Sequence, residues 1–339
     1  MNNSHISHLS SFISPPWGSR WGVALSTLVF SFFLMGCQGE QANDKWPDGL
    51  TVDALLPMTP VKNQTQNPFC WLFAPLATIE TEHLAQGDSV NLSVRYLARM
   101  FLYEQGMRYY SGSSKGREIS LRGTMPMCLQ LLSRYGIQPY DYYERNQIEE
   151  PNFKVLARKV MKAADICRAR RESETEFERQ LNELLDKETG YLVRYVHMLG
   201  AEYTSREFAH SVCRPNEYVM LTTTDSHPYN QWVDLHLTDN QWGDRFYNVP
   251  QDTLMQYIVR ALRSGHPVGW EGGLHGQRTD DHCMTIIGLA HTQQNRYFIF
   301  KNSLGTEYGK DGLVCLSYNY VRNNTIAIMI TRDIMRVVK

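Results

Sequence analysis

The sequence predicts an α+β protein in which helices come first and strands follow. Within residues 70–136, apolar side chains recur at helical spacing, and two of the segments stop at a glycine. Residues 149–211 are densely charged and contain no glycine before Gly190, a pattern typical of solvated helices. After Pro215 the chain changes to short, often alternating apolar runs between turn residues, which indicate strands.

Three helices are expected in the first half, over residues 70–84, 91–106 and 125–136. Asn91 could cap the second helix, and Gly106 and Gly136 could end the second and the third. Pro75 is an awkward member of the first helix, because proline removes a backbone hydrogen bond and tends to kink a helix. The charged segment 149–211 is expected to add two or more helices as a separate lobe or insertion.

The second half is expected to contain strands in several short runs. These runs are EYVMLTTT, VDLHL, RFYNVP, HPVGWEGG, HCMTIIGLAH, RYFIFKNS, GLVCLSY and TIAIMITRD. One helix is expected among them, over residues 251–265, opened by Asp252 and closed by Gly265.

The composition argues against several classes of function. The chain has 339 residues, with 34 Lys and Arg against 35 Asp and Glu, so nothing in its charge indicates a nucleic-acid partner. No H-E-x-x-H, C-x-x-C or Walker-type string is present, so no metal or other cofactor is expected. The sequence leaves open whether the chain forms a homo-oligomer.

The N-terminal region predicts a lipoprotein. Residues 21–36 are almost wholly apolar, and these sixteen residues suit a signal peptide better than a membrane span. The string LMGC, ending at Cys37, resembles a bacterial lipoprotein processing site. The resemblance implies removal of residues 1–36, acylation of Cys37, and attachment to a lipid bilayer at the periplasmic or surface face of the cell envelope. The alternatives to a lipoprotein are a protein with a plain anchor helix and a soluble secreted protein. The polar residues 37–57 would form a tether.

Cys70 stands at the border between a turn-prone run and an apolar run. It could be the first buried residue of a core helix, because free cysteine is among the most buried residue types. It could instead be a nucleophile, because unpaired N–H groups and the dipole at a helix N-terminus favour a thiolate. The stretch alone favours the first interpretation.

A nucleophilic cysteine needs a base, usually a histidine that a third group orients. His282 opens one apolar run, and the following run ends in Asn302. With Gln293 and Gln294 as the loop of a hairpin, Asn302 would lie about three residues, or roughly 10 Å, from His282 along the strand. A shift of register would close that gap.

The segments NQTQNPFCWLFA, DDHCMTIIG and FKNSLGTEYGKDGLV resemble the papain superfamily, and more narrowly its bleomycin hydrolase or aminopeptidase C branch. The resemblance runs from about residue 60 to residue 333 and is weakest between 149 and 211. It implies a papain-like two-lobe fold with the active site between the lobes. The helical lobe would cover residues 58–148, a helical insertion residues 149–212, and the β-rich lobe residues 213–339.

The resemblance also implies the role of each site residue. Cys70 would be the nucleophile, His282 its acid–base partner, and Asn302 the group that orients the imidazole. The side chain of Gln64 and the backbone N–H of Cys70 would stabilise the oxyanion. The expected activity is thiol-dependent hydrolysis of peptides through an acyl-enzyme, with removal of N-terminal residues.

Three departures from the family pattern leave an alternative open. Phe69 is large where relatives have a small or basic residue, Leu304 stands where many have tryptophan, and Pro75 would bend the nucleophile helix. The alternative is a catalytically weak homologue that acts as a peptide-binding or scaffold lipoprotein. For exopeptidase action, residues 334–339 would reach the cleft and the carboxylate of Lys339 would pair with a substrate ammonium, unless this end merely frays.

Overall fold

The computed structural model describes residues 46–113, 118–144, 150–198, 200–273 and 281–336. The predicted signal peptide, Cys37 and the last three residues lie outside these ranges. Within them, no helix is both long enough and apolar enough to cross a membrane.

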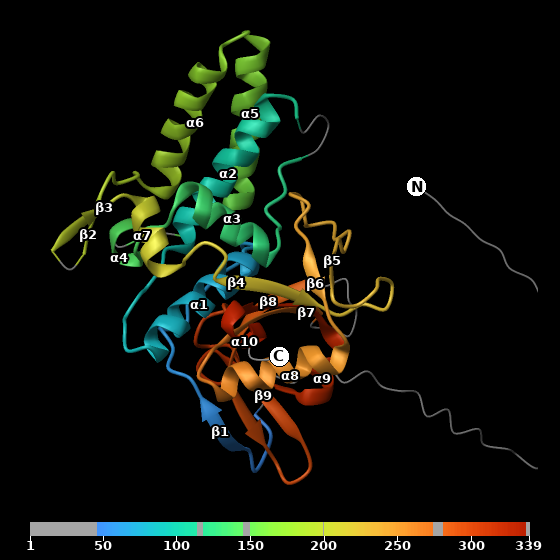
Figure 1. Cartoon of the computed structure of the whole chain (residues 1–339). Helices are drawn as coiled ribbons and strands as arrows, with labels where there is room; N and C mark the ends of the chain where they lie inside the picture. Colours follow the sequence, from blue (N-terminus) through green and yellow to red (C-terminus); the bar gives the residue numbers. More distant parts are fainter. Residues whose placement is uncertain (1–45, 114–117, 145–149, 199, 274–280, 337–339) are drawn as a thin grey trace, which may run out of the picture. The chain divides into compact units, whose positions relative to one another are not determined.

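The predicted α+β class is confirmed, with helices before a large mixed sheet (Figure 1). The helices are α1 (Cys70–Ala85), α2 (Val94–Tyr110), α3 (Met125–Tyr135), α4 (Tyr140–Tyr143), α5 (Phe153–Ala169), α6 (Glu174–Thr189), α7 (Ser205–Val212), α8 (Gln251–Arg263), α9 (Tyr318–Asn324) and α10 (Arg332–Arg336). The strands are β1 (Thr51–Leu55), β2 (Val196–Met198), β3 (Ala201–Tyr203), β4 (Tyr218–Thr222), β5 (Gln231–Val233), β6 (Phe246–Asn248), β7 (Val268–Gly273), β8 (Asp281–His291), β9 (Arg296–Lys301), β10 (Leu313–Ser317) and β11 (Thr325–Thr331).

The main sheet has the strand order β10-β9-β8-β7-β11-β4-β6-β5, and β4 pairs with β6 in parallel. Its two faces are covered by different helices. Met284 and Ile286 of β8 pack in one buried cluster with residues of α8. Cys283 of the same strand packs in another cluster, with residues of α1 and the other helices of the first half. Successive residues of β8 therefore face α1 and α8 in turn, as strand geometry requires.

The second helix differs from its expectation at both ends. Ser93, not Asn91, is the N-cap of α2, and its hydroxyl accepts a hydrogen bond from the backbone N–H of Tyr96. The helix also continues through Gly106. A Cβ at Gly106 would lie 2.8 Å from Cγ1 of Val160 in α5, so this glycine permits close helix packing rather than ending a helix.

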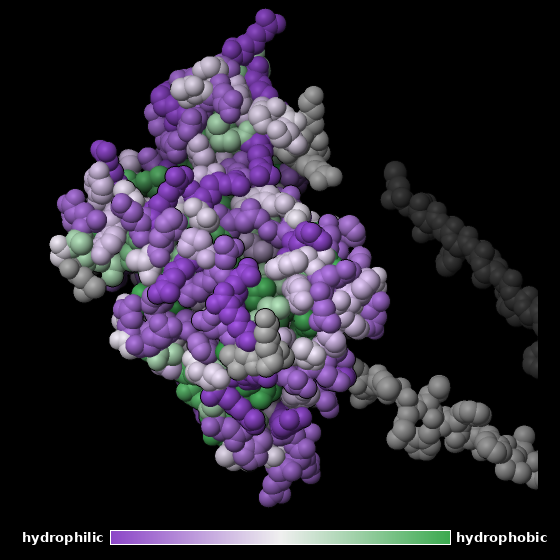
Figure 2. All heavy atoms as spheres, in the orientation of Figure 1, coloured by the Kyte–Doolittle hydropathy of each residue, from purple (hydrophilic) through white to green (hydrophobic). Residues whose placement is uncertain are grey.

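The charged segment forms two amphipathic helices, α5 and α6, which pack together and against α2 (Figure 1). The buried residues of α6 recur every four positions, at Phe177, Leu181, Leu185 and Thr189. Apart from the partly buried Leu184, its other side chains are charged or polar, and Figure 2 shows a largely hydrophilic surface over this hairpin. The division of the chain at residues 148 and 212 stays a prediction.

Part of the predicted tether belongs to the sheet. Residues 51–55 form β1, which pairs antiparallel with the C-terminal part of β8, from Gly288 to His291. A Cβ at Gly288 would lie 2.7 Å from the backbone oxygen of Ala54, so the pairing of these two strands depends on a glycine at that position. The predicted tether as a whole is rich in polar residues, and the strand that pairs with residues 51–55 lies more than 200 residues away in the sequence, so the strand was not predicted.

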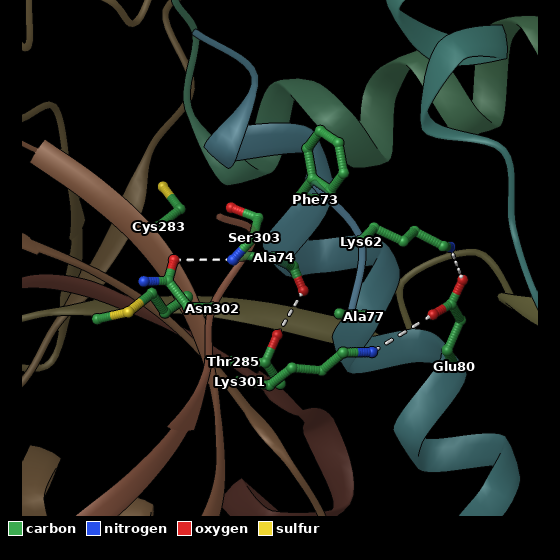
Figure 3. A pocket seen from close by; sticks show the side chains of 11 residues that line it. Lys62, Phe73, Ala74, Ala77, Glu80, Cys283, Thr285, Lys301, Asn302 and Ser303 are labelled. Atoms are coloured by element: carbon green, nitrogen blue, oxygen red, sulfur yellow. Dashed lines mark hydrogen bonds and ion pairs between the residues drawn. The ribbon is translucent and has the colours of Figure 1, made fainter. Parts of the chain in front are cut away.

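A buried carboxylate holds several segments of the fold together. The side chain of Glu80, in α1, accepts hydrogen bonds from Thr59, from Lys62 and from the backbone N–H of Leu92. Lys301, at the end of β9, places its Nζ 3.9 Å from Oε2 of Glu80 (Figure 3). It also donates a hydrogen bond of 2.7 Å to Thr59. Burial lowers the pKa of Lys301 from 10.5 to about 8, although the Glu80 carboxylate acts in the opposite direction.

The ionisation of Lys301 should make stability depend on pH. In the folded protein this amine loses its proton near pH 8, whereas in the unfolded chain it does so near pH 10.5. Between these values the unfolded state binds more protons, so this group makes the free energy of unfolding rise with pH. The difference in unfolding free energy between wild type and Lys301→Met should change by about 2 kcal/mol in favour of wild type from about pH 7.5 to about pH 9.5. Denaturant unfolding of both proteins measures it, and a constant difference would contradict the lowered pKa.

Candidate active site

Cys70 lies at the first position of α1, as the sequence predicts, and its side chain is half-buried. A backbone N–H at this position has no acceptor within the helix, so it is available to a ligand. The preceding residue, Phe69, points into the core. Its ring packs edge-on against Phe153 at 4.9 Å and Trp71 at 6.5 Å between centroids, so it does not occupy the surface in front of the cysteine.

His282 and Asn302 are brought together, as predicted. The distance from Nε2 of His282 to Oδ1 of Asn302 is 2.9 Å. The same amide oxygen accepts a hydrogen bond of 2.7 Å from the backbone N–H of Ser303, which fixes the orientation of the Asn302 side chain. Since an amide oxygen only accepts, Nε2 of His282 carries the proton, and Nδ1 is the nitrogen left for the cysteine.

A shift of register in the hairpin brings the histidine and the asparagine together. Near the turn the pairing of β8 with β9 follows the predicted two-residue loop, with His291 opposite Arg296. The register then shifts between Ile286 and Gly288. Beyond the shift Thr285 pairs with Lys301 rather than with the next residue, so Asn302 lies one position closer to the histidine than an unbroken hairpin would place it.

The surroundings of Cys70 favour the thiolate. The pKa of its thiol lies well below its usual value, chiefly because the thiol of Cys283 forms a hydrogen bond with it. Burial acts in the opposite direction, and a hydrogen bond and the charge of His282 lower the pKa further. Cys70 and His282 are therefore in contact and can form a thiolate–imidazolium pair, a reactive nucleophile at neutral pH.

Gln64 is held beside Asn302 through Ser303. The backbone N–H of Gln64 donates to the backbone oxygen of Ser303 at 2.7 Å, and the Ser303 hydroxyl donates to Oε1 of Gln64 at 2.7 Å. The bridge between Asn63 and Leu304 continues this antiparallel contact. With its oxygen held by Ser303, the amide of Gln64 can offer its NH₂ group to an anion.

Two residues of the site were not predicted, Ser303 and Cys283. Each directly follows a predicted site residue in the sequence, and that adjacency was the only available signal. Their partners, Gln64 and Cys70, lie more than 200 residues earlier in the sequence. Within the described residues, no group of His, Cys, Asp and Glu side chains is placed to hold a metal ion.

The pH dependence of Cys70 alkylation should show the lowered pKa. Because the thiolate is the reacting form, iodoacetamide should modify Cys70 at a pH well below the usual range for a free thiol, about 8.5. His282→Ala removes a hydrogen bond and a positive charge that favour the thiolate, so the midpoint of the rate profile should move to higher pH. Mass spectrometry of the peptide containing Cys70 measures the rate. Identical profiles for the two proteins would contradict the contact with His282.

Comparison with known proteins agrees with this architecture. The sequence family described as papain family cysteine protease matches residues 268–334, a segment that contains His282 and Asn302 but not Cys70. No curated protein sequence matches the chain significantly. Among solved structures, 192 chains do so.

Two of these structures illustrate the range of similarity. PepW of Lactobacillus rhamnosis has a TM-score of 0.64 and 17% identity, over 87% of this chain and 85% of that chain. The bromelain protease of Ananas comosus, in complex with the E64 inhibitor, has a TM-score of 0.39 and 14% identity, over 84% of this chain and 99% of that chain. The helical first half, the mixed sheet and the similarity to PepW together show that this chain has a papain-like α+β fold.

Proposed function

We propose that the protein is a cysteine peptidase that hydrolyses peptide bonds through an acyl-enzyme on Cys70. The observation that carries the proposal is one continuous set of contacts. Cys70 begins a helix and touches His282, whose far ring nitrogen lies 2.9 Å from Asn302. A structural cysteine would need none of these partners.

The geometry supports a definite role for each group. The Cys70 thiolate would attack the carbonyl carbon of the scissile bond, and the resulting oxyanion would accept hydrogen bonds from the Gln64 NH₂ group and the Cys70 N–H. Removal of one such donor typically costs about 3–4 kcal/mol of transition-state stabilisation. His282 would donate its Nδ1 proton to the leaving amine and then activate the water that hydrolyses the thioester.

The alternative, a weak homologue that binds peptides without cleaving them, has lost part of its support. Phe69 packs inward against Phe153, so it does not narrow the cleft. Pro75 is buried within an α1 that continues on both sides of it. Leu304 is the departure that still favours the alternative, because leucine cannot cover the bond between His282 and Asn302 as an indole would.

Removal of N-terminal residues is the finer proposal, and its support is the resemblance to the aminopeptidase C branch. The predicted C-terminal arm contributes less to it than expected. Residues 332–336 form α10, and Ile334 is buried in the cluster that contains α8. Residues 337–339 lie outside the described ranges, so the pairing of the Lys339 carboxylate with a substrate ammonium stays a prediction.

Activity measurements on three variants test the proposed function. Cys70→Ala should abolish hydrolysis and His282→Ala should nearly do so, because each removes a reacting atom. Asn302→Ala should retain more activity, since Asn302 only orients the ring. Mass spectra of peptides digested by the wild-type protein, with free and with blocked amino termini, separate exopeptidase from endopeptidase action. Equal activity of wild type and Cys70→Ala would refute the catalytic role, and peptide binding without cleavage would establish the alternative.

We also propose that acylated Cys37 attaches the protein to a lipid bilayer outside the cytoplasm, on the basis of the LMGC string. Each buried acyl CH₂ contributes about 0.8 kcal/mol, so several acyl chains hold a protein at a membrane firmly. Cys37→Ser should therefore move the protein from the membrane fraction to the soluble fraction, or block its processing, without loss of hydrolytic activity. Unchanged partitioning and processing of this variant would contradict lipidation.

A further inference from the structure

Helix α1 and strand β8 are joined by a specific contact close to the candidate active site. The hydroxyl of Thr285 donates a hydrogen bond of 2.9 Å to the backbone oxygen of Ala74 (Figure 3). The same hydroxyl lies 3.4 Å from the hydroxyl of Thr78. Thr285, Thr78 and the backbone of Ala74 are all buried, so this contact fixes the strand against the helix.

The spacing of the two elements places a second cysteine at the nucleophile. Cys70 precedes Ala74 by four residues, slightly more than one helical turn and about 6 Å along the helix axis. Cys283 precedes Thr285 by two residues, about 6.6 Å along the strand and on the same face of the sheet. The two cysteines therefore lie at similar distances from the contact between Thr285 and Ala74, and Cys70 packs against the buried cluster that contains Cys283. A hydrogen bond between the two thiols also lowers the pKa of Cys70.

Cys283 is buried, whereas Cys70 is half-buried. The Cys283 side chain is 2% exposed and packs in the cluster that contains α1, on the opposite face of β8 from Met284 and Ile286. Its neighbour across the strand pair is Glu271 of β7. A small oxidant can therefore reach Cys70 from the solvent, whereas Cys283 is shielded from the solvent next to it.

The other cysteines have different environments. Six of the seven cysteines lie within the described residues, and all six are free thiols. Burial raises the pKa of Cys128, and it raises that of Cys315 to about 11, so these thiols stay protonated and unreactive. Cys70, by contrast, is only half-buried, and its surroundings favour the thiolate, as expected of an oxidation-sensitive cysteine with a second thiol next to it.

We propose that Cys70 and Cys283 form a reversible oxidation site, in which a hydroperoxide converts the two thiols into a disulfide that arrests the nucleophile. The arrest of hydrolysis rests on the proposed function, whereas formation of the disulfide does not. The site would protect Cys70, because a sulfenic acid without a neighbouring thiol proceeds to sulfinic acid, which thiols do not reduce.

The chemistry balances in two steps. The Cys70 thiolate attacks one oxygen of the hydroperoxide, breaks the O–O bond and becomes a sulfenic acid, while the other oxygen leaves as an alcohol or water after taking a proton. The Cys283 sulfur then attacks the sulfenic sulfur, and the hydroxyl leaves as water with the Cys283 proton. Two electrons pass from the sulfurs to the peroxide, and two equivalents of an external thiol return them by exchange.

Peroxide treatment followed by a thiol reductant tests the proposal. Full-length wild-type protein and Cys283→Ala are exposed to hydrogen peroxide, divided, and half of each sample is treated with dithiothreitol. Wild type should yield a peptide pair linked through Cys70 and Cys283, lighter by about 2 Da than the two reduced peptides, and dithiothreitol should restore Cys70 alkylation. Cys283→Ala should instead gain about 32 Da on the Cys70 peptide, and dithiothreitol should not restore its alkylation.

Cys315→Ala is the matched control, because it removes a buried strand cysteine outside the site. It should behave as wild type, and a melting curve confirms that each variant is folded. The proposal is overturned if wild type gives no peptide pair linking the two cysteines, or if Cys283→Ala recovers alkylation as fully as wild type. Both readouts are independent of hydrolysis, so a protein that forms the disulfide but cleaves no peptide would refute the proposed function and leave the oxidation site standing.

Discussion

The buried carboxylate of Glu80 is the constraint on which the arrangement of the site depends. It binds Lys62, two residues before Gln64, and it lies near Lys301, the residue before Asn302. Glu80 itself belongs to the helix that begins with Cys70. Segments from three parts of the chain that carry site residues therefore meet at one charged group. Loss of one partner from such a buried ion pair typically costs about 3–5 kcal/mol, so stability and site geometry are coupled here.

The sheet supplies the second constraint, because it sets the position of the histidine relative to the asparagine. The shift of register between Ile286 and Gly288 lies on the half of β8 where β1 also pairs. A residue larger than glycine at 288 would meet the backbone of β1. The contact between β1 and β8 thus helps to maintain the shifted pairing of β8 with β9. That pairing places Asn302 one position closer to His282, although the two residues lie several positions along the strands from the β1 contact.

The local features of the fold could be predicted from the sequence, and the contacts between distant segments could not. The turn-prone run before Cys70 and the apolar run after it indicated the start of α1, and the QQ turn indicated the β8–β9 hairpin. The predicted N-cap of α2 was wrong because Asn91 and Ser93 are both good capping residues. Only the structure shows which of the two side chains accepts a hydrogen bond from an unpaired backbone N–H of the helix. The predicted end of α2 at Gly106 was wrong because a glycine can allow close helix packing as well as end a helix. Ser303 and Cys283 could not be predicted, because the residues that they contact are distant in the sequence and are brought close only by the tertiary structure.

The inward position of Phe69 joins the inserted helical hairpin to the nucleophile. Phe69 rests against Phe153, the first residue of α5, and the side chain of Asn67 binds the backbone on both sides of residue 152, at Pro151 and Phe153. The α5–α6 hairpin is thus a structural support for the loop that leads to Cys70, and not an appendage that could be exchanged freely. A shortened chain that lacked the hairpin would leave an aromatic ring exposed next to the reactive sulfur and the loop before it unanchored.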